Sequence, residues 1–188
     1  VNLVHLFHKV NGTMQPDTEY MKFLYDSGFK QIVFPVESGS QRVLDTYASA
    51  KLNLKMMDVV ALTQEAVKIG IICPVNMMIG FPDETTQEMA TSVMLAQRLI
   101  DVGAPYVTFF IPIPFPGSSL YDTAINKGYL NSNFDPDTMN WKNGVMQNTT
   151  VPREKIVELR DAAWEKVNPP EIVSKRLRES IGSRWKPV

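Results

Sequence analysis

The chain has 188 residues and a formal net charge of −1 at pH 7; 44% of its residues are hydrophobic and 21% are charged. This composition is typical of a soluble globular domain with one core, and it lacks the basic excess that would point to a nucleic-acid partner. Cys73 is the only cysteine, which excludes an internal disulfide, a four-cysteine zinc site and an iron–sulfur cluster held by this chain alone. No apolar run reaches about 18 residues, so we expect no membrane span, and the cysteine usage favours a reducing, cytoplasmic location.

Strand-like apolar runs alternate with helical patterns along most of the chain. The expected strands span residues 1–10, 30–40, 71–81 and 105–115. The expected helices between and after them span residues 16–28, 41–48, 53–70, 85–104 and 117–130. A polar, turn-rich loop then covers 131–150, and two further helices are expected over 152–167 and 169–185.

The first expected helix has clear signals at both ends. Asp17 is a favourable residue at a helix start, and Gly28 is a favourable residue just past a helix end. Within the helix, Tyr20, Phe23 and Leu24, and Ser27 after them, fall at helical spacing, which supports the helix.

Two later helices carry start signals of the same kind. Thr85 followed by Glu88 forms the pattern of a capping box, and Thr150 is expected to cap the helix that begins near residue 152. Asp83 and Glu84 precede Thr85, where negative charge suits the helix dipole.

Strands that are apolar on both faces and alternate with helices predict a parallel sheet covered by helices. Right-handed crossovers wind such units into either a barrel wall or an open doubly wound sheet. Prolines in or beside the expected strands favour an irregular barrel wall; they are Pro35, Pro74, Pro112 and Pro114. We therefore predict an α/β fold, an incomplete (β/α) barrel over residues 1–130, extended by a polar loop and C-terminal helices over 131–188.

Ligands of parallel α/β folds bind at the carboxyl ends of the strands. After the second expected strand, Glu37 and Ser38 open the stretch "ESGS", where a carboxylate can accept both hydroxyls of a ribose, or an ammonium group. The alternative is that Ser38 or Ser40 only caps the next helix while Glu37 is solvated. Asn76 is a lone polar residue in the third expected strand, so its amide needs either neighbouring backbone or a polar ligand as partner.

Other polar residues give weaker signals. His5 and His8 lie three residues apart on an expected strand and would point to opposite faces, so we expect no shared metal site. Cys73, in an apolar run, is expected to be a buried and inert thiol. Lys51 is either a surface charge or a residue that faces the strand ends, since it follows the helix after "ESGS".

Three stretches together resemble a known family: "FKQIVFPVESGSQRVLD", "GIICPVNMMIGFPDETTQE" and "GAPYVTFFIPIPFPGSSLYDTAINKG". In order and spacing they are similar to the later half of the partial barrel of radical S-adenosylmethionine enzymes. The similarity covers about residues 1–130 and is greatest to the group with cobalamin-binding and methylthiolation members. That group includes the anaerobic Mg-protoporphyrin IX monomethyl ester cyclase and related iron–sulfur oxidoreductases.

The resemblance implies an oxidoreductase that uses S-adenosylmethionine and a four-iron–four-sulfur cluster, with cobalamin in some members. It assigns cofactor binding to one set of strand-end residues: Glu37, Ser38, Asn76, Ile79, Gly80, Ile111, Pro112 and Ile113. The polar members of this set would lie near the ribose or the amino acid moiety, and the others near the adenine. His5 and Lys9 would face a small-molecule substrate.

One departure from the family is decisive for activity. The C-x-x-x-C-x-x-C motif that holds the cluster is absent, and Cys73 cannot replace three thiolates. Because the chain also begins without Met, we expect it to be a C-terminal fragment of a longer enzyme, inactive alone, whose partner is the N-terminal part of the same protein. The alternative is a non-catalytic binding or scaffolding module derived from the same half barrel, in which exposed sheet edges favour oligomerisation.

Overall fold

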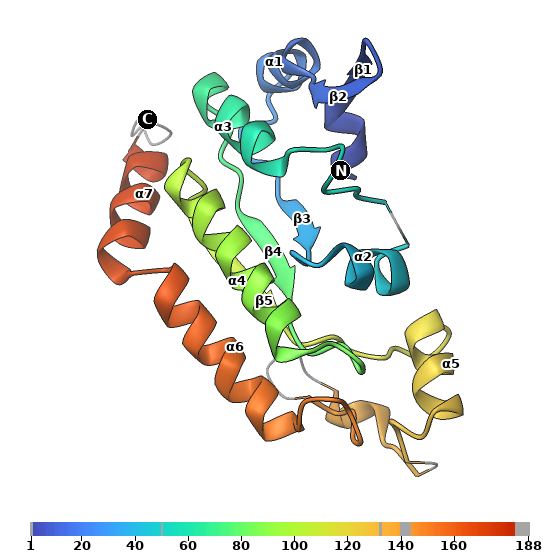
Figure 1. Ribbon diagram of the computed structural model, residues 1–188. Helices are drawn as coiled ribbons and strands as arrows, with labels where there is room; N and C mark the ends of the chain where they lie inside the picture. Colours follow the sequence, from blue (N-terminus) through green and yellow to red (C-terminus); the bar gives the residue numbers. More distant parts are fainter. Residues whose placement is uncertain (1, 50, 132, 140–143, 183–188) are drawn as a thin grey trace.

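The computed structural model describes residues 2–49, 51–131, 133–139 and 144–182 (Figure 1). The strands are β1 (Phe7–Val10), β2 (Thr13–Pro16), β3 (Phe34–Glu37), β4 (Val75–Met78) and β5 (Val107–Phe110). The α-helices are α1 (Thr18–Asp26), α2 (Gln41–Tyr47), α3 (Val59–Ile69), α4 (Thr86–Asp101), α5 (Ser119–Asn126), α6 (Arg153–Val167) and α7 (Pro170–Gly182). Two short 3-10 helices are η1 (Leu3–Leu6) and η2 (Pro136–Thr138).

The predicted α/β class, with parallel strands alternating with helices, is confirmed. Strands β3, β4 and β5 form a parallel sheet in that order, and helices α2 to α4 lie in the connections between them. Among the described residues this sheet does not close into a barrel. The division into residues 1–130 and 131–188 stays a prediction, although α6 packs against β5 and α4.

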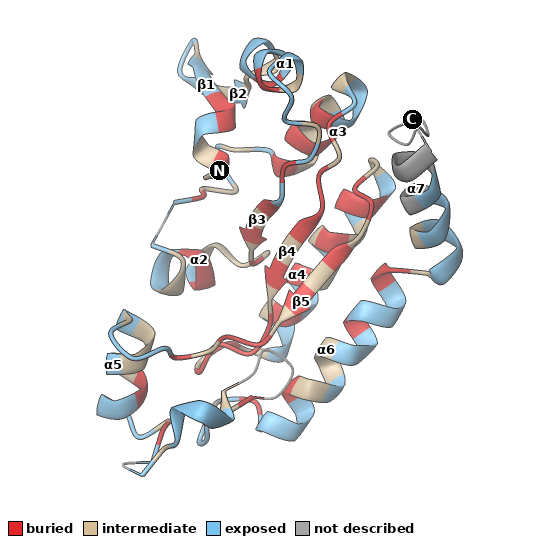
Figure 2. Cartoon of the chain, turned by 180° about the vertical axis from the view of Figure 1, so that it is seen from behind, coloured by how far each residue is buried: buried red, intermediate tan, exposed pale blue. Residues whose placement is uncertain are grey.

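The two faces of the parallel sheet differ in burial. Along each strand a fully buried residue alternates with a half-buried one, as the period of two requires. Helix α4 packs against β4 and α6 packs against β5 (Figure 1), whereas the view from behind shows β4 and β5 without a helix in front of them (Figure 2). The half-buried face carries Pro35, Asn76 and Thr108 side by side in register.

The prediction of a parallel strand over residues 1–10 is wrong. Residues Leu3–Leu6 form η1, and the chain then turns back on itself as an antiparallel hairpin of β1 and β2, separate from the parallel sheet. Asn11 and Gly12 connect the hairpin, with φ of 49° and 86°. Two residues with positive φ are what a tight type I′ hairpin turn needs, and Asn-Gly supplies them at low cost.

Helix α1 forms as predicted, but only part of its helically spaced set is buried. Met21 and Leu24 are buried, whereas Phe23 is 64% exposed and Tyr20 is 39% exposed. The helix turns its Met21–Leu24 side toward η1 and α3, so the two aromatic rings stack on each other at the surface instead, with centroids 6.4 Å apart.

Most helix starts follow the sequence signals. Asp17 caps α1, and Thr85 with Glu88 forms the complete capping box of α4. Helix α3 begins at Val59, later than expected, because the Asp58 carboxylate accepts bonds from the backbone N–H groups of its first turn. The expected cap Thr150 is wrong, since α6 starts after Pro152 without a side-chain cap bond.

One large apolar core joins the helices to the parallel sheet. It includes Val75, Val107 and Phe109 from the strands, and Ile156 and Val167 from α6. A smaller cluster around Ala124, Leu130 and Met146 lies under α5. Within the described parts of the chain, no helix has the length and apolar character needed to cross a membrane.

Candidate functional site

A cavity of about 500 Å³ opens at the carboxyl ends of the parallel strands. Glu37 and Met78 from the ends of β3 and β4, and Ile113 from the segment after β5, contribute to its wall. Helix α2 and the start of α5 flank these strand ends (Figure 1). The volume lies within the range of about 300–1,000 Å³ that is usual for small-molecule sites, so the predicted end of the sheet does carry a pocket.

The backbone around Glu37 is strained. Its φ is 68°, and the register of the β3–β4 pairing shifts between Pro35 and Glu37. The N–H of Ser38 donates to the carbonyl of Val36 at 2.9 Å, which closes a three-residue turn of a rare kind. The left-handed conformation costs a non-glycine residue about 1–2 kcal/mol. This strain lies at the wall of the cavity, where such outliers often have a functional reason.

The Glu37 carboxyl has an unsatisfied oxygen. Its Oε2 is buried and has no hydrogen-bond partner among the described residues. Burial raises the pKa of this carboxyl, and the positive charge of Lys51 opposes the rise. Lys51 also lines the cavity, which favours the prediction that it faces the strand ends over the alternative of a surface charge. A buried carboxylate without a donor needs one, and a ligand hydroxyl or ammonium group in the cavity can provide it.

The structure separates the predicted cofactor-binding residues into two groups. Glu37, Pro112 and Ile113 line the cavity. The remaining five do not: Ser38, Asn76, Ile79, Gly80 and Ile111.

Each residue of the second group has a place in the fold. Ser38 is fully buried, and its hydroxyl oxygen lies 3.2 Å from that of Ser92. Ile79 and Ile111 belong to the apolar core. Gly80 donates its N–H to the Glu84 carboxylate at 2.7 Å. The cofactor contacts assigned to these residues stay predictions.

Asn76 shares the half-buried face of the sheet with a cavity residue. It pairs in register with Pro35, which lines the cavity, and with Thr108. Glu37 and Asn76 therefore come from adjacent parallel strands. They are not paired with each other, because the register shift places Glu37 opposite Met77. Asn76 itself is half-buried, between the fully buried Val75 and Met77.

His5 and Lys9 do not lie at the end of a parallel strand, because that strand is absent from the described structure. His5 is an exposed residue of η1, and Lys9 is exposed on β1. From this part of the chain Asn2 and Leu3 line the cavity instead. The substrate-facing role of His5 and Lys9 stays a prediction without support from the cavity.

The contact between two aromatic residues of the cavity wall was not predicted from the sequence. Tyr47 at the end of α2 stacks on Phe81, with ring centroids 4.6 Å apart and an interplanar angle of 15°. The Tyr47 hydroxyl donates to the Asp83 carboxylate at 2.8 Å, and burial together with this bond raises the pKa of the phenol. The 36-residue separation of Tyr47 from Asp83 leaves no local signal for this contact.

Glu84 does not have the helix-dipole role that the sequence favoured. It is fully buried, and its Oε2 accepts the N–H groups of Gly80 and Phe81 at 2.7 and 3.1 Å. Burial raises the pKa of this carboxyl to about 7, although the two backbone bonds oppose the rise. The carboxyl holds the turn after β4 in place, and this turn carries Phe81 into the cavity wall.

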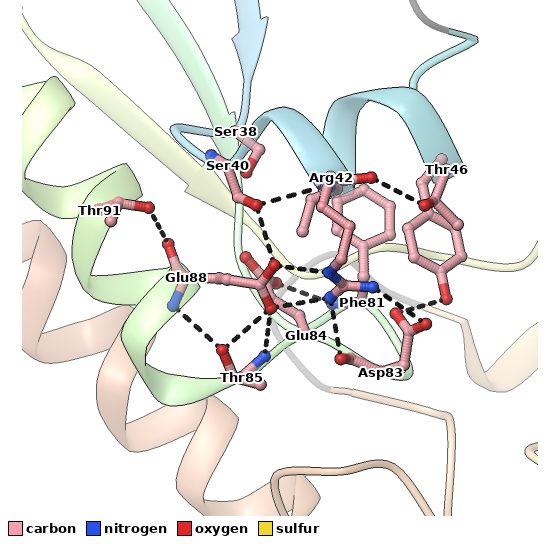
Figure 3. Close-up of polar contacts among 12 residues, drawn as sticks. Ser38, Ser40, Arg42, Thr46, Phe81, Asp83, Glu84, Thr85, Glu88 and Thr91 are labelled. Carbon is pink, nitrogen blue, oxygen red and sulfur yellow. Dashed lines mark hydrogen bonds and ion pairs between the residues drawn. The ribbon is translucent and has the colours of Figure 1, made fainter.

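An ion-pair network joins the loops after β3 and β4 (Figure 3). Glu88 on α4 accepts two bonds from the Arg42 guanidinium and one from the Ser40 hydroxyl. Arg42 also reaches Asp83, through its carboxylate at 3.2 Å and its carbonyl at 3.0 Å. The bond to Arg42 is the main reason that the pKa of Glu88 lies far below its usual range.

Comparisons with known proteins give partial matches. No protein-family model matches the chain. The chain is similar to an uncharacterized methyltransferase of Pyrococcus horikoshii, with 31% identity over 121 residues, which are 64% of this chain and 24% of that protein. It is also similar to the cytidylyl-2-hydroxyethylphosphonate methyltransferase of Streptomyces wedmorensis, with 29% identity over 136 residues, 69% of this chain and 24% of that protein.

Among solved structures, the chain is similar to coproporphyrinogen III oxidase of Escherichia coli, which is described as a radical SAM enzyme. The superposition covers 88% of this chain and 29% of that one, with 13% identity and a TM-score of 0.44, an extent of likeness that does not establish a shared fold. The chain spans about a quarter of the length of the two methyltransferases that it matches.

Proposed function

We propose that this chain supplies the nucleoside-binding strand ends of a radical S-adenosylmethionine enzyme that transfers a methyl group. The observation that carries the proposal is the Glu37 carboxyl, which has a buried oxygen without a donor at the wall of a cavity at three parallel strand ends. The motif order noted in the sequence supports the family, and the names of the two similar methyltransferases support the reaction class.

The chemistry of the cavity fits S-adenosylmethionine. Glu37 can accept hydrogen bonds from ribose hydroxyls or from the ammonium group, and the positive charge of Lys51 suits the carboxylate of the same ligand. Pro112, Ile113 and Phe81 give the apolar surface that a purine ring needs. The residues of this chain thus bind and orient the cofactor and exclude water from it.

The cluster ligands must come from residues outside this chain. Cys73 is the single cysteine of the sequence and is buried in the core, so the chain cannot offer three thiolates to a four-iron–four-sulfur cluster. The cluster and S-adenosylmethionine together supply radical chemistry when bound. In this proposal the preceding part of the same protein is the partner that carries the cluster, and the similarity to the cobalamin-binding group adds cobalamin as a further cofactor of the complete protein.

The proposal is tested by NMR titration of the chain with S-adenosylmethionine. We expect weak binding, because the iron–sulfur cluster to which the cofactor would coordinate is absent from this chain. The chemical-shift changes should be centred on Glu37, Lys51 and Ile113. Glu37→Gln removes a charged acceptor, and a charge-assisted bond contributes about 1.5–3 kcal/mol, so we expect the dissociation constant to rise by about tenfold or more.

The matched control is Glu65→Gln. The Glu65 carboxylate lies on the surface of α3 and accepts only a Lys68 bond in the described structure, at 2.7 Å. This variant should bind S-adenosylmethionine like the unchanged chain. Binding that is insensitive to Glu37→Gln, or no shift change at millimolar cofactor, contradicts the proposal and favours a scaffolding module.

A further inference from the structure

The loop after Glu37 lies directly on helix α4, although the two are far apart in sequence. The Gly39 N–H donates to the Ser92 hydroxyl at 2.9 Å, and the Ser38 hydroxyl oxygen lies 3.2 Å from the same atom. Both serines are fully buried. A Cβ on Gly39 would lie 2.6 Å from the Thr91 carbonyl oxygen, so the approach is as close as a backbone without a side chain permits.

The same loop has a second attachment to α4 one turn earlier. The Ser40 hydroxyl donates to Glu88 Oε1 at 2.9 Å, in the network of Figure 3. Within the loop, the Ser40 N–H donates to the Ser38 hydroxyl at 3.0 Å. Every residue from Ser38 to Ser40 is therefore bonded directly to Ser92 or Glu88.

We propose that Ser92 and Glu88 are positioning residues, which hold the Ser38–Ser40 loop on α4 and so keep Glu37 in its left-handed conformation with the carboxyl at the cavity. Glu37 immediately precedes this loop, and its φ of 68° is not one that a glutamate adopts without restraint. When the loop is released from α4, the backbone of Glu37 relaxes toward the common regions and the carboxyl leaves the cavity wall.

This role rests on the proposed function, in which Glu37 binds the cofactor, but its test needs no ligand. The measurement is a carbon-13 NMR titration of the Glu37 carboxyl in the complete 188-residue chain, together with hydrogen exchange of the Gly39 amide. In the unchanged chain the carboxyl titrates above its ordinary pKa of 4.5, since burial disfavours its charge and Lys51 opposes this only in part.

Ser92→Ala removes the hydroxyl that holds Gly39. We expect the Glu37 pKa to fall back toward 4.5, since the carboxyl becomes solvated, and the Gly39 amide to exchange at least about tenfold faster. The matched control is Thr63→Ala, because Thr63 is also fully buried but its hydroxyl, among the described residues, bonds only to the Val59 carbonyl of its own helix. The control should change neither observable.

A folded Ser92→Ala chain with an unchanged Glu37 pKa overturns the proposal. A Thr63→Ala control that shifts the Glu37 pKa by the same amount overturns it as well. Where Ser92→Ala fails to fold, Ser40→Ala gives the decisive measurement. It leaves the buried Ser92 contacts in place and removes the attachment to Glu88, together with the 3.4 Å bond that the Ser40 hydroxyl accepts from the Val43 N–H at the start of α2. Its Glu37 pKa should move in the same direction by a smaller amount, and no movement refutes the role. A chain that fails to bind S-adenosylmethionine refutes the proposed function and leaves these ligand-free results unaffected.

Discussion

The Arg42 guanidinium binds both carboxylate oxygens of Glu88, with Nε–Oε1 and Nη2–Oε2 distances of 2.7 and 2.8 Å. The two residues lie 46 positions apart, on α2 and α4, so their bond fixes the loop after β3 relative to the loop after β4. Because Glu37, directly before the first loop, and Phe81, within the second, both line the cavity, this surface ion pair has a geometric role beyond its contribution to stability.

Arg42→Lys should weaken this connection. Lysine cannot reproduce the two parallel bonds of the guanidinium, and the pair is partly exposed to solvent, with 45% of the Arg42 side chain accessible, which limits its worth to about 1 kcal/mol. We expect that loss in the free energy of unfolding, measured with urea at pH 7. Arg153→Lys is the control, since Arg153 pairs at the surface with its sequence neighbour Glu154.

The loss from Arg42→Lys should also depend on pH. The folded pKa of Glu88 is below its ordinary value of 4.5, so the charged carboxylate adds stability above that pH, and this part is lost as the pH falls through the folded value. The unfolding curves of the two chains should therefore converge in acid. Equal losses for the Arg42 and Arg153 variants, or a gap that widens in acid, would count against the network.

Glu84→Gln should change stability with the opposite pH dependence. The folded pKa of Glu84 is about 7, against 4.5 for an ordinary glutamate, so its contribution is complete below pH 4.5 and is lost as the pH rises through 7. Glutamine keeps an oxygen for the Gly80 and Phe81 N–H groups but cannot ionise. Relative to the unchanged chain, the variant should gain on the order of 2 kcal/mol between pH 5 and pH 8.

Urea unfolding of both chains at several pH values measures this difference. A difference in the free energy of unfolding that stays constant between pH 5 and pH 8 would show that Glu84 is already ionised in the folded chain at pH 5. Its burial would then not govern its titration. Glu65→Gln serves as the reference for removal of a surface carboxylate.

The features that the sequence predicted well are those with contiguous signals. The capping box of Thr85 and Glu88 and the cap at Asp17 each need only a few neighbouring residues, and the structure has both. The hairpin of β1 and β2 had a local signal as well, in Asn11-Gly12, but the apolar run before it matched a strand of the parallel sheet equally well.

The features that the sequence did not predict depend on partners far along the chain. Nothing near Glu84 indicates that it turns back to the backbone instead of facing solvent, and nothing near Ser92 indicates a contact with Gly39, 53 residues away. Likewise, the outward face of Tyr20 and Phe23 on α1 depends on where α3 and η1 pack. Such choices are made by tertiary packing, which overrides local periodicity.

Asn168 attaches the end of α6 to the edge of the parallel sheet. Its side-chain amide accepts the Val107 N–H at 2.8 Å and donates to the Val107 carbonyl at 2.9 Å, so it occupies the place of a neighbouring strand at the start of β5. The same nitrogen donates to the Trp164 carbonyl at 3.1 Å. Asn168 is buried, and a buried strand edge needs such a partner for its backbone groups.

Asn168→Asp tests this attachment with almost no change in shape. At pH 7 the carboxylate keeps the bond from the Val107 N–H but loses both donors, and it places a negative charge beside the Val107 and Trp164 carbonyl oxygens. We expect a loss of about 2–4 kcal/mol in the free energy of unfolding by urea.

The matched control is Asn148→Asp, because the Asn148 amide donates to the Gly128 carbonyl in an exposed loop. This substitution should change the free energy of unfolding by less than about 0.5 kcal/mol. Protonation in acid restores one donor to the aspartic acid, so the loss at position 168 should shrink as the pH falls; a loss that equals that of the control, or that is independent of pH, means that the amide does not hold the sheet edge.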